Sequence, residues 1–99
     1  MTYTVNYRPE ALKTLRKLDP NVSKMILKWI DKNLVDCENP RIHGKALKGN
    51  LKGIWRYRVD DYRVFAHIQD NVLLILIIDV EHRSTAYNRD SLSFSLGTY

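Results

Sequence analysis

The sequence predicts a single small α+β domain with the element order β-α-α-β-β-β, in which two N-terminal helices pack on one face of a small, mostly antiparallel sheet. Near the N-terminus, apolar residues recur in two segments with the period of a helix. Later, three strand-like runs are separated by short polar pairs, the pattern of a meander. A chain of 99 residues has room for one hydrophobic core, so we expect residues 1–99 to form one domain.

The first strand and the first helix are predicted over the opening residues. Residues 3–7 alternate tyrosine or valine with threonine or asparagine, which is the period of a half-buried strand. Pro9 then indicates a helix start, because the N–H that proline lacks would have no partner in the first turn. The apolar residues behind it fall on one helical face, at Ala11, Leu12, Leu15 and Leu18.

The second helix has the clearest pattern in the chain. Asp19 precedes Pro20, so its carboxylate can accept hydrogen bonds from N–H groups of the first turn. Apolar residues then recur at helical spacing, at Val22, Met25, Ile26, Trp29, Ile30 and Leu34. We assign Met25, Trp29 and the later Trp55 to core packing.

The rest of the chain is predicted as a basic, mostly irregular connection over residues 38–53 and then a meander of three strands. Asp60-Asp61 and Asp70-Asn71 mark the turns between the strands, which we place at 54–59, 62–68 and 72–80. The last strand is apolar on both faces, as expected of a central strand, and could pair with the first. The serine-rich segment after Arg83 either forms a short helix or stays irregular.

Strand alternation sorts the side chains of the predicted hairpin onto two faces. The face expected to pack against the helices carries Trp55, Tyr57, Val59, Tyr62, Val64, Ala66 and Ile68. The opposite face carries Arg56, Arg58, Arg63, Phe65 and His67, with Arg83 just beyond the last strand. Guanidinium groups bind phosphates and aromatic rings stack on unpaired bases, so this face is either a nucleic-acid site or the solvated side of the sheet.

Composition restricts the class of protein further. The formal net charge of +5 favours an acidic partner or a polyanion. The single Cys37 cannot form an internal disulfide and the chain opens without an apolar secretory segment, so we expect the cytoplasm. The apolar run at 72–78 is too short to cross a bilayer. No residues have zinc-ligand spacing, and we predict neither a metal nor a cofactor.

Four stretches together resemble the RelE/ParE toxin superfamily: RPEALKTLRKL after the opening strand, KALKGNLKGIWRYRV, DYRVFAHI and DVEHRSTAY. In order and spacing they cover residues 3–87. The resemblance implies a sheet of about four strands with two helices on one face, the fold that the periodicity also predicts. It further implies a toxin of a type II toxin–antitoxin module that either cleaves mRNA in the ribosomal A site or poisons DNA gyrase.

We favour the first activity, that of a metal-independent endoribonuclease, or mRNA interferase, in which a ribose 2′-OH attacks the adjacent phosphate. By the resemblance, Arg63 and Arg83 stand at positions of phosphate-binding arginines, and Tyr87 at that of an aromatic residue used in base stacking or proton transfer. Arg56 and Arg58 stand where well-known members carry lysines. Arginine stays protonated in proteins, so neither residue can serve as a general base.

The base must then be another side chain. His82 beside Arg83 and His67 on the arginine face are candidates because histidine titrates near neutral pH, although either could be merely structural. Tyr87 is a third candidate if nearby cations stabilise its phenolate, and Glu81 could act as a base or orient an arginine. The expected RNA contacts are Lys45, Lys48, Lys52, Phe65 and His67, although the lysines could belong to a solvated basic loop.

Two non-enzymatic alternatives stay open. A gyrase-binding module would tolerate arginine at the lysine positions, and a degenerate toxin would keep only antitoxin binding. Under either toxin hypothesis the partner is a cognate acidic, RelB-like antitoxin whose C-terminal segment masks the arginine face or dislodges the C-terminal tail. The interferase hypothesis adds mRNA and the ribosomal A site as partners.

Overall fold

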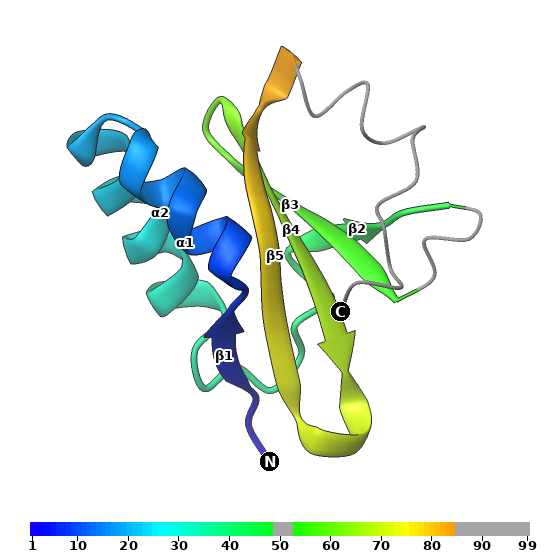
Figure 1. Cartoon of the computed structure of the whole chain (residues 1–99). Helices are drawn as coiled ribbons and strands as arrows, with labels where there is room; N and C mark the ends of the chain where they lie inside the picture. Colours follow the sequence, from blue (N-terminus) through cyan, green and yellow to red (C-terminus); the bar gives the residue numbers. More distant parts are fainter. Residues whose placement is uncertain (49–52, 85–99) are drawn as a thin grey trace.

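The computed structural model describes residues 1–48 and 53–84. Its five strands form one sheet in the order β1-β5-β4-β3-β2, and Figure 1 shows both helices on one face of that sheet. The elements are β1 (Thr4–Tyr7), α1 (Pro9–Lys17), α2 (Pro20–Asn33), β2 (Gly44–Ala46), β3 (Ile54–Val59), β4 (Tyr62–Gln69), the short 3-10 helix η1 (Asp70–Val72) and β5 (Leu74–His82).

The topology places the last strand in the middle of the sheet. β5 pairs in parallel with β1 and antiparallel with β4, while β3 pairs antiparallel with both β4 and β2. The predicted pairing of the first and last strands is confirmed. The predicted α+β fold, with two helices on one face of a mostly antiparallel sheet, is confirmed as well.

The sheet differs from the prediction in two details. Within the segment 38–53, predicted as mostly irregular, Gly44–Ala46 forms β2 and raises the sheet from about four strands to five. A strand of three residues is too short to show an alternating pattern. The last strand begins at Leu74, because η1 and Leu73, whose φ of 52° is left-handed, complete the turn before it. The predicted tail after Arg83 lies, from residue 85, outside the described residues.

The helices begin where the sequence predicted. Pro9 and Pro20 open α1 and α2, and the Asp19 carboxylate accepts a hydrogen bond of 2.8 Å from the Asn21 N–H. The predicted apolar face of α2 packs on the sheet: Ile26, Ile30 and Leu34 are buried, while Val22, Met25 and Trp29 are partly buried against them. Among the described residues, no helix has the length and apolar character needed to cross a membrane.

The sheet buries apolar side chains on both faces. The main core lies on the helix side and includes Ile75, Ile77 and Val80 of β5. A second, smaller cluster joins Ile54, Phe65 and Ile78 on the opposite face. A register shift between Phe65 and Ala66 gives β5 one extra residue, and this bulge lets Ile77 and Val80, three residues apart, both face the main core.

Replacing Asp19 by alanine removes the side-chain cap of α2. We expect the free energy of unfolding, measured by urea denaturation, to fall by about 1 kcal/mol. Asp31→Ala near the other end of α2 is the control, and it should not destabilise, because a carboxylate near a helix C-terminus opposes the helix dipole. An equal loss in both variants would contradict the capping assignment.

Candidate nucleic-acid interface

Arginines line up across the strands on the face of the sheet away from the helices. Arg58 of β3 pairs with Arg63 of β4, and Arg63 pairs with Glu81 of β5. Cross-strand partners point to the same face, so these side chains lie side by side. Arg56 points the same way and pairs with Lys45 of β2. Strand register therefore brings together the arginines that alternation had assigned to one face.

Arg63 is at the centre of this positive charge. Its Nη1 donates hydrogen bonds to the carbonyl oxygens of Asp60 at 3.3 Å and Tyr62 at 3.1 Å, which anchors the guanidinium at the β3–β4 turn. Burial lowers the pKa of Arg63, and the positive charges of Arg58, Arg56 and Arg83 lower this pKa further. Arginine remains protonated even so, and a bound anion would relieve the repulsion.

Arg83 joins the same end of the sheet. Its backbone N–H donates to the Asp61 carbonyl oxygen at 2.7 Å, immediately after β5 ends at His82. Its guanidinium lies 3.8 Å from the Asp61 carboxylate. Both side chains are exposed, and an exposed ion pair of this length contributes little, so a phosphate could replace the carboxylate.

Two pockets extend the positive surface along β2 and β3. One, of about 310 Å³, is lined by Ile42, His43, Gly44, Lys45, Arg56 and Arg58. The other, of about 240 Å³, is lined by Lys45, Ala46, Leu47, Lys48 and Arg56. Because both pockets share Lys45 and Arg56, they adjoin. We call the surface formed by Lys45, Lys48, Arg56, Arg58, Arg63 and Arg83 the basic strip.

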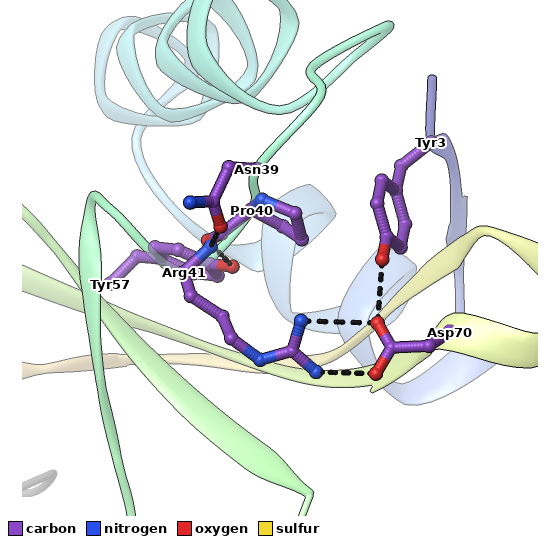
Figure 2. A network of polar contacts seen from close by, with 6 residues as sticks. All are labelled: Tyr3, Asn39, Pro40, Arg41, Tyr57 and Asp70. Carbon is purple, nitrogen blue, oxygen red and sulfur yellow. Dashed lines mark hydrogen bonds and ion pairs between the residues drawn. The ribbon is translucent and has the colours of Figure 1, made fainter. Parts of the chain in front are cut away.

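A polar network holds the segment that leads into β2, as Figure 2 shows. Arg41 donates to both carboxylate oxygens of Asp70, at 3.0 and 2.8 Å, and the Tyr3 hydroxyl donates to the same carboxylate at 2.5 Å. The Arg41 guanidinium also lies 5.6 Å from the ring centroid of Trp55. The network therefore joins three segments that are far apart in the sequence: the residue before β1, the α2–β2 connection and η1.

A buried tyrosine fixes the same segment against β3. The Tyr57 hydroxyl donates to the Pro40 carbonyl oxygen at 2.6 Å, and burial raises the pKa of Tyr57 well above its ordinary value, so the hydroxyl keeps its proton. Gly44 allows the close approach, because a Cβ there would lie 2.8 Å from the Tyr57 ring. This packing places the neighbouring His43 and Lys45 beside β3.

The structure places the two histidines predicted as bases away from Arg63. His82 pairs with Tyr62, their rings meet edge to face at 5.4 Å, and Tyr62 packs against the helix-side core. His67 lies on the arginine face, but four residues beyond Arg63 on β4, roughly 13 Å along an extended strand. The His67 ring packs closely against Gly53, because a Cβ added to Gly53 would lie 3.1 Å from this ring.

The prediction that Phe65 presents an open ring for base stacking was wrong. Its side chain lies on the expected face but is fully buried with Ile54 and Ile78. Alternation assigns a residue to a face of the sheet and does not tell whether something covers it there. Two other predicted site residues, Lys52 and Tyr87, lie outside the described residues.

His43 was missed by the sequence analysis although it lines the larger pocket of the basic strip. Its segment showed no strand pattern, and the pairing of the three residues of β2 with β3 is what places His43 beside β3. The available signal was weak: a histidine next to a glycine and a lysine in a basic run.

The fold is that of a RelE-like toxin. The crystal structure of the toxin–antitoxin complex RelBE2 from Mycobacterium tuberculosis matches with a TM-score of 0.76 and 28% identity, over 85% of this chain and 94% of that chain. Toxin RelG of M. tuberculosis is 30% identical over 90% of this chain and 100% of its own length. Toxin RelE of the same organism is 29% identical over 86% of each chain.

A family model also matches most of the chain. Residues 5–87 match the family described as "ParE toxin of type II toxin-antitoxin system, parDE". The chain belongs to this family, within the RelE/ParE superfamily of type II toxins. The superfamily resemblance found in the sequence is thereby confirmed.

Asp70→Asn tests the network in Figure 2. Hydrogen bonds from Arg41 and then from Tyr3 hold the pKa of Asp70 below its ordinary value. Their stabilisation is therefore complete above the unfolded-chain pKa of about 3.9 and is lost as pH falls through the lower folded-state pKa. We expect the variant to melt at a lower temperature than the wild type at neutral pH and at the same temperature in strong acid.

Thermal denaturation followed by circular dichroism across this pH range checks the prediction. Asp36→Asn is the matched control, because Asp36 is exposed and its left-handed backbone (φ 60°) also suits asparagine. A difference between wild type and Asp70→Asn that persists undiminished in strong acid would show that the carboxylate charge is not the cause.

Proposed function

We propose that this toxin is a metal-independent mRNA interferase that acts in the cytoplasm by cleaving mRNA in the ribosomal A site. The observation that carries the proposal is Arg63, held between Arg58, Arg56 and Arg83 at one end of the sheet. A gathering of like charges costs stability, and a phosphate group that binds there offsets this cost. The superfamily resemblance supplies the reaction class, and the basic strip supports it.

In the proposed cleavage reaction the arginines stabilise negative charge and do not transfer protons. When the ribose 2′-OH attacks the adjacent phosphate, negative charge grows on the non-bridging oxygens of the phosphorane. Guanidinium groups can hold two such oxygens at once, and Arg63 and Arg83 are the residues we assign to this role. Lys45 and Lys48 lie further along the basic strip, where contacts to flanking phosphates would position the RNA.

The same surface explains how a toxin of this kind can be inhibited. We propose that a cognate acidic, RelB-like antitoxin covers the basic strip with its carboxylates and so competes with RNA. The solved relative RelBE2 is itself a toxin–antitoxin complex. A net charge of +5, with cations gathered on one face, favours association with an acidic segment.

Replacing both Arg63 and Arg83 by alanine should abolish toxicity while leaving the protein folded, because Arg83 is exposed and Arg63 is only partly buried. Losing one transition-state hydrogen-bond donor commonly lowers a rate by about a hundredfold or more. Growth after induced expression without antitoxin measures toxicity, and circular dichroism checks folding. Arg16→Ala, an exposed arginine on α1, is the matched control and should remain toxic.

Primer extension on a cellular mRNA during brief expression tests the reaction itself. New cuts at defined positions within codons, absent from the double variant, would support the interferase. Growth arrest with DNA breaks and no mRNA cuts would instead support the alternative, a DNA gyrase inhibitor. Such a binding module needs no catalytic acid or base. Full toxicity of a folded double variant would overturn the assignment of the arginines.

A further inference from the structure

The arginines of the basic strip cannot accept a proton, so the proposed cleavage needs another side chain for that step. Cleavage by a 2′-OH needs a group that accepts the hydroxyl proton, and a guanidinium cannot do so. The predicted histidine candidates, His67 and His82, lie away from Arg63. The pocket of about 310 Å³ beside Arg56 and Arg58 is lined by one histidine among the described residues, His43.

We propose that His43 is the proton acceptor of the cleavage reaction, acting within the pocket that it forms with Lys45, Arg56 and Arg58. The inference rests on the proposed interferase function. A neutral imidazole nitrogen has a lone pair for the 2′-OH proton. Arg58 lines the same pocket and pairs with Arg63 across the strands, so the pocket adjoins the arginine that we assign to the reacting phosphate.

His43 is exposed, and it is positioned by one ring contact and by the anchoring of the residues before it. From α2, the Trp29 ring meets the imidazole edge to face, with 6.1 Å between ring centroids. On the chain before it, the Pro40 carbonyl is bonded to the buried Tyr57 hydroxyl, and Arg41 is held in place by Asp70. Catalytic groups are effective when packing and hydrogen bonds restrict them in this way.

The residue after His43 is held just as closely. Gly44 packs against the Tyr57 ring, where no larger residue fits, and Lys45 is in register with Arg56. The charged groups of the pocket are Lys45 on β2 and Arg56 and Arg58 on β3, while α2 presents the uncharged Trp29. His43 thus lines the pocket from a segment that is fixed before and after it.

The proposed step balances without a metal or a redox partner. The 2′-OH gives its proton to the His43 imidazole as the bond from O2′ to phosphorus forms. The bond from phosphorus to O5′ then breaks, and the leaving oxygen takes a proton from water. The products are a 2′,3′-cyclic phosphate and a 5′-hydroxyl end, and the imidazolium returns its proton to solvent.

His43→Gln tests the assignment, because glutamine keeps hydrogen-bonding capacity but does not titrate. The assay is single-turnover cleavage of an mRNA in programmed bacterial ribosomes by the full-length toxin, repeated from acidic to alkaline pH. We expect the rate constant to fall about a hundredfold while toxin affinity for the ribosome changes little. If His43 accepts the proton, the wild-type rate depends on pH and the variant loses this dependence. Circular dichroism confirms folding, and Lys13→Gln on α1 is the control.

The possible outcomes separate the two proposals. If His43→Gln cleaves at the wild-type rate with the same pH profile, while the Arg63 and Arg83 double variant is inactive, the proton-acceptor role is overturned and the interferase stands. His67→Gln and His82→Gln are measured in parallel. If the pH dependence of the cleavage rate disappears in one of these variants instead, the proton acceptor is that histidine. If the wild type makes no cuts, the proposed function fails and this inference fails with it.

Discussion

The burial of β5 on both faces is the constraint on which the rest of the structure depends. Ile75, Ile77 and, past the bulge, Val80 face the helices, while Ile78 belongs to the cluster on the opposite face. A strand that is apolar on both sides belongs in the interior of a sheet, so β1 and β4 flank it and the helices cover one face. The sheet extends from β5 through β4 and β3 to β2, and the basic strip crosses these strands on the face away from the helices.

The edge of the sheet is held by polar contacts rather than by a large apolar surface. β2 is three residues long, and the segment before it is anchored by the Tyr57 hydroxyl and by the ion pair of Arg41 with Asp70. These contacts make the position of the pocket beside Arg56 dependent on residues outside the basic strip. The structure thereby separates the residues that position the site from those that carry its charge.

The electrostatics of the site follow from strand register. Arg58 and Arg63 are directly opposite each other, a pairing that costs stability in a sheet unless something relieves it. A nearby carboxylate, Glu81, is the cross-strand neighbour of Arg63. Such an arrangement suits a surface that exchanges partners, because an acidic antitoxin segment and an RNA phosphate would satisfy the same guanidinium groups.

The sequence by itself determined the class of fold, both helices with their starts at Pro9 and Pro20, and the face on which Arg56, Arg58 and Arg63 lie. Periodicity, capping residues and alternation are local properties, so one sequence carries them. Only the tertiary structure decided that Phe65 is covered, that His82 faces Tyr62, and that His43 stands beside the arginines. Those facts depend on a cluster formed by three strands, on a strand end and on a three-residue edge strand, all of which are set by contacts between distant segments rather than by any local pattern.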